Sequence, residues 1–217
     1  MRCGAAVGLL LALGAGVFAG WNLGAPSTRG TSAAAPPPSP TLPATGAVAG
    51  AGQKRVVLFG DGMVDGYGLP DGKSLPLLLA RARPDLMLID LGLSHEWSTQ
   101  LVARVRDVTT AQADAVVLWT GSYDPANGVG AQQYAANVAT LLDALKGTRV
   151  LLLPPVSLPT GPDVSAYAVE LDRVAAQHGV QVLDATSALS APDWLDSGQE
   201  LGPRTDAALA ALLAKAL

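Results

Sequence analysis

The sequence predicts an α/β protein, a three-layer α/β/α sandwich built on a five-stranded parallel sheet. From residue 54 onward, short apolar runs alternate five times with longer segments of helical character. The apolar runs are nearly continuous in valine, leucine and alanine, which is typical of strands covered on both faces. Hydrophobic residues make up 49% of the chain and charged residues 15%, so helices and sheet can share a sizeable core.

Each expected strand is a short apolar run that ends at a turn signal. The first run ends in a Gly-Asp-Gly turn, and the fourth stops at Pro154 and Pro155. The expected strands are residues 55–59, 86–91, 115–119, 150–153 and 180–183. Ligands bind outside the carboxyl ends of such strands, so the loops after strands one, two, three and five are where a site is expected.

The ends of the expected helices are marked by turn and cap residues. Pro84 ends the first helix, Ser98 can cap the start of the second, and Gly147 and Gly179 close the third and fourth. His178 lies in the last turn of the fourth expected helix, where a histidine usually stabilises the carboxyl end of the helix. The expected helices are residues 75–82, 98–108, 131–145, 164–177 and 205–217.

The segment before the folded domain predicts an export or anchoring signal followed by a linker. Residues 1–24 carry one charge, Arg2, and then an apolar stretch. This fits a signal peptide with small residues near Ala19 for cleavage, or one membrane anchor across about 30 Å of hydrocarbon. Both interpretations predict an extracytoplasmic location, secreted or anchored. Residues 25–53, rich in proline and alanine, predict a disordered linker, which leaves 54–217 as the folded domain.

Charge and cysteine content exclude several classes of function. The formal net charge is −4 and no basic run occurs, so nucleic-acid binding has little electrostatic support. Cys3 is the only cysteine, so neither a disulfide nor a cysteine-based metal site can form within one chain. No cofactor is expected.

The stretch around the first strand resembles the first block of the SGNH/GDSL hydrolases. Gly60 and Asp61, followed by Gly-Tyr-Gly-Leu at 66–69, stand where that family has its Gly-Asp-Ser-Leu motif. The resemblance continues to the end of the chain and implies the family's flavodoxin-like fold. The other matching positions are 167–171, 178–180, 182–184, Gly198, Leu201 and Pro203.

The resemblance also implies where the chemistry would lie. In the family, a serine after strand one attacks an ester, a histidine near the last helix activates it, and an aspartate three residues earlier holds that histidine. A glycine after strand two and an asparagine after strand three help to stabilise the oxyanion. In this chain those five positions hold, in that order, Gly62, Glu200, Ser197, His95 and Tyr123. The resemblance therefore predicts a degenerate member that lacks the catalytic residues.

Three ways of rebuilding a site stay open. His95 is the candidate base of a relocated active site, and its candidate nucleophiles are Ser94, Ser98, Ser122 and Ser197. Carboxylates and an imidazole after strand ends could instead hold a divalent ion or do acid/base work; these are Asp61, His95, Asp124 and Glu200. Aromatic faces beside carboxylates suit sugar rings, and the aromatic candidates are Trp97, Tyr123 and Trp194.

The expected function is non-catalytic binding at the old cleft. The ligand would be a cell-envelope glycan, an acylated molecule or a partner protein, and the N-terminal segment would contact the membrane if it is not cleaved. The candidate binding residues are Asp61, His95, Trp97, Tyr123, Asp124, Trp194 and Glu200. The alternatives are a GDSL-type esterase or acyl hydrolase with a relocated site and a purely structural interaction module.

Overall fold

The computed structural model of the chain describes residues 53–217. The expected leader and almost all of the expected linker, residues 1–52, lie outside the described residues, so the predictions made for them stay predictions. None of the helices in the described part is both long enough and apolar enough to cross a membrane.

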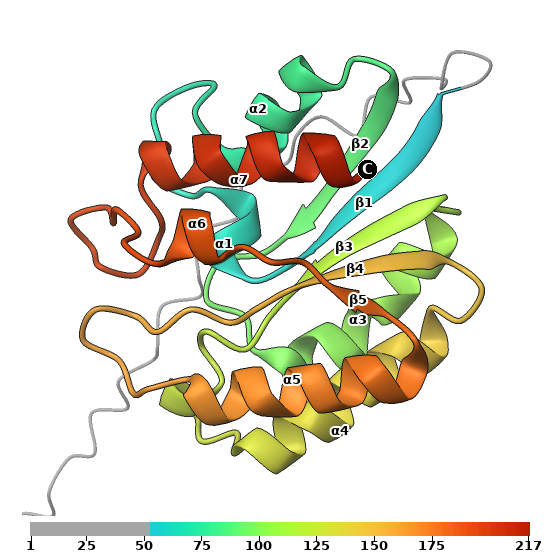
Figure 1. Ribbon diagram of the computed structural model, residues 1–217, viewed down its shortest axis with the longest axis vertical. Helices are drawn as coiled ribbons and strands as arrows, with labels where there is room; N and C mark the ends of the chain where they lie inside the picture. The colour runs from blue at the N-terminus through green and yellow to red at the C-terminus, as the bar shows by residue number, and fades with distance from the viewer. Residues whose placement is uncertain (1–52) are drawn as a thin grey trace, which may run out of the picture. The chain divides into compact units, whose positions relative to one another are not determined.

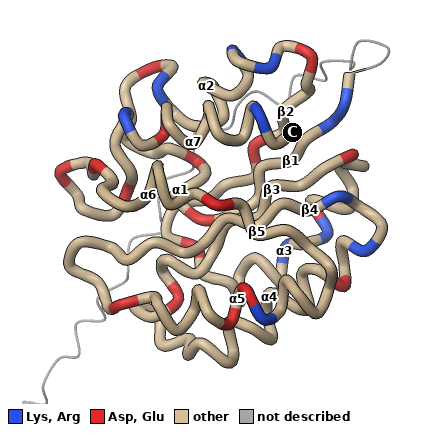
Figure 2. The backbone as a smooth tube through the Cα atoms, in the orientation of Figure 1, with Lys and Arg blue, Asp and Glu red and all other residues tan. Residues whose placement is uncertain are grey.

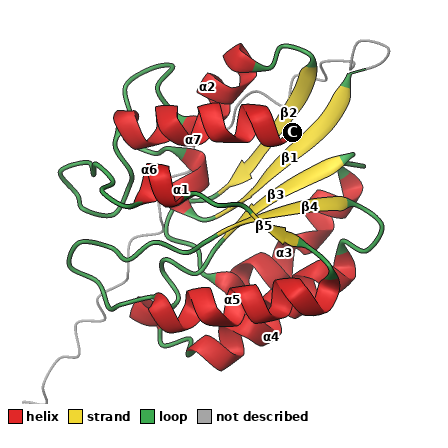
Figure 3. Cartoon of the chain, viewed as in Figure 1, coloured by secondary structure: helices red, strands yellow, loops and turns green. Residues whose placement is uncertain are grey.

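A five-stranded parallel sheet forms the centre of the domain, with strand order β2-β1-β3-β4-β5 (Figures 1 and 3). The strands are β1 Lys54–Gly60, β2 Leu86–Gly92, β3 Ala115–Trp119, β4 Arg149–Leu153 and β5 Gln181–Val182. The chain moves outward from β1 to β2 and then returns to the other side of β1 for β3. Ligand crevices lie at such a reversal, outside the carboxyl ends of the strands. The predicted fold class is confirmed.

Helices cover both faces of this sheet (Figure 1). They are α1 Gly62–Asp65, α2 Leu75–Ala82, α3 Ser98–Thr110, α4 Ala131–Ala144, α5 Ser165–His178, α6 Thr186–Leu189 and α7 Pro203–Ala216, with a 3-10 turn at Pro125–Asn127. The alternation of side chains along β1 defines two cores. Val56 and Leu58 pack with residues of α2 and α7, whereas Val57 and Phe59 pack with residues of α3, α4 and α5.

Burial separates the central strands from the edge strands. Every residue of β3 is buried, as is β1 from Val56 onward, which agrees with strands covered on both faces. The five middle residues of β2 are only half-buried, and β5 has two residues rather than the expected four. Edge strands have a neighbour on one side only, so the expectation of full burial fails for them.

Contacts at the helix ends correct the expectation for Ser98 and confirm the one for His178. Ser98 is the first residue of α3 and not its cap, because Trp97 holds the cap position. The backbone N–H of Ser98 donates instead to Oδ2 of Asp124, 3.0 Å away. His178 ends α5, with Nδ1 2.9 Å from the Val174 carbonyl oxygen, so its expected role at the helix end is confirmed.

Candidate active site

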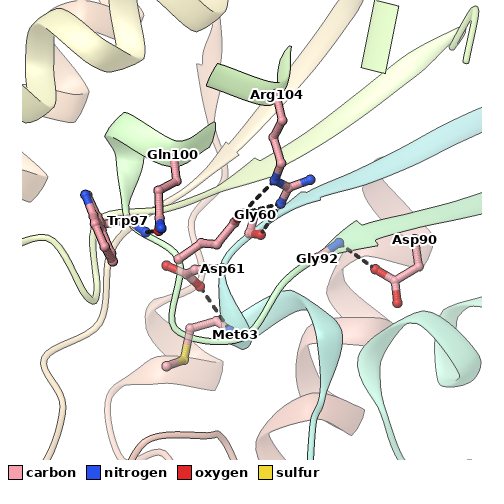
Figure 4. Close-up of polar contacts among 9 residues, drawn as sticks. Gly60, Asp61, Met63, Asp90, Gly92, Trp97, Gln100 and Arg104 are labelled. Atoms are coloured by element: carbon pink, nitrogen blue, oxygen red, sulfur yellow. Dashed lines mark hydrogen bonds and ion pairs between the residues drawn. The ribbon is translucent and has the colours of Figure 1, made fainter. Parts of the chain in front are cut away.

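The turn after β1 is fixed by Asp61, which is fully buried. Its Oδ1 accepts a hydrogen bond from the Met63 N–H at 3.0 Å, and its own N–H donates to the Trp119 carbonyl oxygen at 3.2 Å. Figure 4 shows the first of these contacts beside the end of the strand. Burial raises the pKa of the Asp61 carboxyl well above its usual range. Asp61 therefore ties down its own loop.

Position 62 is the point at which three of the five substituted positions meet. A β-carbon built on Gly62 would lie 2.6 Å from each carboxyl oxygen of Glu200 and 2.8 Å from the Tyr123 hydroxyl. The carboxyl ends of neighbouring parallel strands lie at one edge of the sheet, which is why segments so far apart in sequence converge. The space beside Gly62 is therefore filled by polar groups from the loops after β3 and before α7.

The Glu200 carboxyl is buried, and its pKa is strongly perturbed. The residue is 3% exposed, and its Oε1 accepts a hydrogen bond from Ser94 Oγ at 3.2 Å. Its Oε2 has no hydrogen-bond partner among residues 53–217. Burial, followed by the nearby charge of Asp65, raises the pKa of Glu200 to about 8. The group therefore carries a proton through most of the neutral range.

The Tyr123 and His95 side chains lie beside the Glu200 carboxyl. The Tyr123 hydroxyl donates to the Gln199 carbonyl oxygen at 2.5 Å, and burial raises the pKa of the phenol. The His95 ring meets the Tyr123 ring edge-on, with centroids 5.5 Å apart, and its Nε2 is hydrogen-bonded to Gln199 Oε1. No serine or threonine hydroxyl in the described part of the chain bonds the imidazole. The His95–serine pair of the relocated site is therefore not formed.

The backbone of His95 supports the alignment with the family. Its φ is +61°, in the left-handed region that favours glycine. The resemblance places a glycine at this position. The backbone has thus kept a glycine-type conformation although the side chain is a histidine.

A groove of about 420 Å³ opens above Glu200. Its lining includes Tyr67, His95, Trp194, Asp196, Gln199 and Glu200. Ser197 also lines it, and its Oγ accepts a hydrogen bond from the Gln199 N–H at 3.3 Å. The volume falls within the range of small-molecule sites, about 300–1,000 Å³. Of the expected binding residues, His95, Trp194 and Glu200 line the groove, and Tyr123 lies directly behind them.

Comparison with known proteins identifies the family and supports the fold. Residues 58–207 match the GDSL-like lipase/acylhydrolase family. This chain belongs to that family. No protein of curated function matches the sequence.

Solved structures of GDSL proteins share the fold. A lipase/acylhydrolase from Enterococcus faecalis is 19% identical, with a TM-score of 0.67 over 76% of this chain and 95% of that one. The esterase EstA from Pseudoalteromonas is 15% identical, with a TM-score of 0.64 over 75% and 96%. A member of the lipolytic G-D-S-L family from Veillonella parvula is 14% identical, with a TM-score of 0.65 over 75% and 97%. At these identities the likeness shows the fold.

Several expected site residues of this GDSL-like domain lie outside the groove. Asp124 is buried, and both of its oxygens accept hydrogen bonds from Ser98. The Ser122 hydroxyl accepts a hydrogen bond from the Val156 N–H at 3.0 Å. Trp97 is half-buried at the start of α3 and packs against the core. These contacts stabilise loops, so a binding role for Asp124 and Trp97 has no support from their position.

The carboxylates and His95 do not form a metal centre in the described structure. Within residues 53–217, no group of three or more His, Cys, Asp or Glu side chains has an arrangement that could hold a metal ion. Asp124 bonds Ser98, whereas Glu200 lies over Gly62, so the two groups serve different parts of the loop region.

Sequence reasoning missed Arg104, which joins the His95 loop to β1 (Figure 4). Its Nε is 2.6 Å from Glu96 Oε2, and a second nitrogen donates to the Gly60 carbonyl oxygen at 3.2 Å. The guanidinium lies over the Phe59 ring, 4.6 Å from its centroid. The sequence did contain a signal for this contact. Arg104 follows the buried Leu101 by three residues, so both side chains lie on the inner face of α3.

Buried carboxyls with raised pKa values, Glu200 and Asp206 among them, predict that this GDSL-like domain loses stability as the pH rises. Burial raises the pKa of Glu200 to about 8 and that of Asp206 to about 8. The folded state then binds more protons than the unfolded state between about pH 4 and pH 8, so unfolding free energy falls across that window and levels off above it. We expect urea unfolding to give a value lower at pH 8 than at pH 5 by a few kcal/mol.

The matched variants identify the groups responsible. Glu200→Gln and Asp206→Asn should each flatten the pH dependence, because each removes one raised carboxyl. Asp172→Asn, at an exposed position on α5, should leave the slope unchanged. Stability that rises from pH 5 to pH 8 in the unchanged chain would contradict the assignment.

Proposed function

We propose that this GDSL-like domain is an extracytoplasmic pseudo-hydrolase that binds a cell-envelope glycan or an acylated ligand in its groove. The observation that carries the proposal is the environment of Gly62. An ester hydrolase of this type needs a hydroxyl on the residue after Asp61 and a base within reach of it. Here the residue has no side chain, and the Glu200 carboxyl and Tyr123 hydroxyl fill the adjacent space.

The lining of the groove supports ligand binding. Tyr67 and Trp194 offer flat aromatic faces, and Asp196 and Gln199 offer polar groups beside them. Aromatic surface with a few polar groups is typical of small-molecule sites and suits the apolar face of a sugar ring. Membrane contact through the N-terminal segment, if that segment is uncleaved, belongs to the same proposal, and a partner protein is the other ligand class.

A hydrolase with a relocated nucleophile is the second candidate. Ser94 favours it, because its Oγ donates to Glu200 Oε1 at 3.2 Å. A carboxyl that has lost its proton could take the proton of this hydroxyl during attack on an ester. The raised pKa of Glu200, about 8, would then make turnover increase with pH.

Ester turnover separates the two candidates. We expect the purified chain to hydrolyse p-nitrophenyl acetate and butyrate at the rate of the buffer, and to take no label from a fluorophosphonate probe. The reason is the missing hydroxyl at position 62. Turnover above buffer that disappears in Ser94→Ala, or labelling at Ser94, would contradict the proposal and establish the second candidate.

Binding is measured on the same protein. Tetramers of glucosamine, N-acetylglucosamine and glucose, together with monoacylated glucose, form the ligand panel, with tryptophan fluorescence as the readout. At least one ligand should bind and lose affinity in Trp194→Ala. Trp97→Ala is the matched control, because Trp97 is also a half-buried loop tryptophan but lies outside the groove. Binding that survives Trp194→Ala, or no binding at all, would contradict the proposed use of the groove.

A further inference from the structure

The strand β2 lies at one end of the strand order, and its outer side is exposed (Figure 3). Its five middle residues are only half-buried. Leu88 packs against the core shared with α2 and α7, and Ile89 packs against the core shared with α3, so both faces of the strand are in contact with helices. The exposure that remains therefore belongs to the side of β2 that has no neighbouring strand.

Backbone groups of β2 point toward this open side at every second residue. In a parallel sheet, one residue of a strand turns both its N–H and its C=O to the same neighbour, and the next residue turns them the other way. The Leu93 N–H donates to the Gly60 carbonyl oxygen at 3.1 Å, so the odd-numbered residues of β2 bond to β1. The even-numbered residues, Leu88 and Asp90 among them, therefore direct their backbone groups outward.

Two of the outward N–H groups already have acceptors. The Leu86 N–H donates to the Arg83 carbonyl oxygen at 3.1 Å, and the Gly92 N–H donates to Asp90 Oδ1 at 2.9 Å. The outward backbone groups of Leu88 and Asp90 have no such bond to the rest of the chain within residues 53–217. Groups of this kind are a template on which another strand can pair.

The side chains of β2 do not protect this edge. Natural edge strands are usually blunted by lysine, proline or a bulge. β2 reads Leu-Met-Leu-Ile-Asp-Leu-Gly, which contains no lysine or proline, and it pairs with β1 in unbroken register along its whole length. Asp90 is the only charged residue of the strand. The composition of β2 therefore favours pairing with another strand.

Charge favours a second copy of this chain in the antiparallel direction. Beside the amino end of β2, the neighbouring β1 begins with Lys54 and Arg55, where the tube is blue in Figure 2. At the carboxyl end lie Asp90 and Asp65, and the Cβ of Asp65 is 3.0 Å from a β-carbon built on Gly92. Antiparallel pairing brings the basic end of one copy to the acidic end of the other, whereas parallel pairing would bring like charges together.

We propose that two copies of this chain associate through β2, with the two strands antiparallel about a two-fold axis at Ile89. In this register the backbone groups of Leu88 in one copy bond to those of Asp90 in the other, so the free outward groups are all used. Ile89 then faces Ile89 of the second copy, Met87 faces Leu91, and Asp90 faces the neutral Leu88. An axis at Asp90 would instead oppose two carboxylates.

Disulfide trapping on the full chain tests the register, in a Cys3→Ser background that leaves one introduced cysteine per chain. Opposed residues that share no hydrogen bond have Cα atoms about 4.5 Å apart, close enough for a disulfide. Ile89→Cys should therefore form a covalent dimer on mild oxidation with copper phenanthroline. Val182→Cys is the matched control, because Val182 is half-buried on the opposite edge strand β5, and it should stay monomeric.

Sedimentation velocity of the Cys3→Ser chain measures association without a cross-link. We expect a monomer–dimer equilibrium whose dissociation constant rises by at least about tenfold in Met87→Lys, because a lysine on an edge strand opposes pairing. Met87 is in neither set of core residues, so this variant should unfold at the same urea concentration as the unchanged chain. Leu77→Lys, at an exposed apolar position on α2, should leave the equilibrium unchanged.

Three results would overturn the proposal. They are a monomer at every concentration, equal trapping of the Ile89→Cys and Val182→Cys chains, and a dimer that Met87→Lys leaves intact. Amide hydrogen exchange at Leu88 and Asp90 identifies the occupant if the chain is monomeric. Slow exchange there would show that another segment of the same chain covers the edge of β2.

Discussion

The combined variant Gly62→Ser, Ser197→Asp and Glu200→His is expected to hydrolyse p-nitrophenyl acetate about 10² to 10⁴ times faster than the unchanged chain. The three substitutions install the nucleophile, the base and the residue that holds the base at positions the family uses for them. Because a β-carbon at position 62 would lie 2.6 Å from the Glu200 carboxyl oxygens, a base in place of Glu200 would face the new hydroxyl directly.

The single variant Gly62→Ser serves as the control for this gain of activity. It should stay inactive and unfold more readily by about 1–3 kcal/mol, because the new side chain meets the Glu200 carboxyl and the Tyr123 hydroxyl. Both variants are compared by ester turnover and by urea unfolding. A combined variant that folds as well as the unchanged chain but remains at the buffer rate would contradict this expected gain of activity.

Gly60→Ala is expected to destabilise the domain by more than about 4 kcal/mol, enough to prevent recovery of folded protein. A β-carbon at this residue would lie 2.1 Å from the carbonyl oxygen of Trp119 and 2.7 Å from Cγ2 of Val64. The Trp119 carbonyl belongs to the backbone of β3, which pairs with β1 at this residue. It also accepts a hydrogen bond from Asp61, so it cannot move away without breaking the contact that sets the site loop.

Gly130→Ala is the matched control, measured by the same urea unfolding. Gly130 is the N-cap of α4 with a φ of −71°, and a β-carbon added to it would meet no heavy atom within 4 Å. Its replacement should change stability by no more than about 0.5 kcal/mol. If Gly60→Ala and Gly130→Ala unfolded at the same urea concentration, the close approach of β1 and β3 would be contradicted.

Most of the fold was predictable because its signals are local. The runs of apolar residues indicate the five strands, and the bounds of α2 and β3 agree with the expected ones. The segments α1 and α6 were missed, since four residues are too few to show helical periodicity. The short β5 was overestimated, because an apolar run does not show where its partner strand stops pairing.

The candidate site was predictable in part. Gly62, His95, Tyr123 and Glu200 converge because each lies in a loop at the same edge of the sheet. The direction of a loop side chain depends on packing, which the sequence does not contain. Asp124 therefore turned out to hold the start of α3 rather than face a ligand.

Groove residues contributed by neighbouring loops were also beyond sequence reasoning. No feature of the sequence singles out Gln199, yet it meets both the His95 ring and the Tyr123 hydroxyl. Its side-chain oxygen faces the imidazole that was expected to serve as a base. Contacts of this kind arise only when the loops after β2, β3 and before α7 are assembled.

The direction of β1 separates the start of the described chain from the groove. The described chain enters at the amino end of β1, and the groove lies beyond the carboxyl ends of the strands. Seven residues at about 3.3 Å each separate the two by roughly 20 Å. Residue 53 therefore lies on the side of the domain remote from the groove.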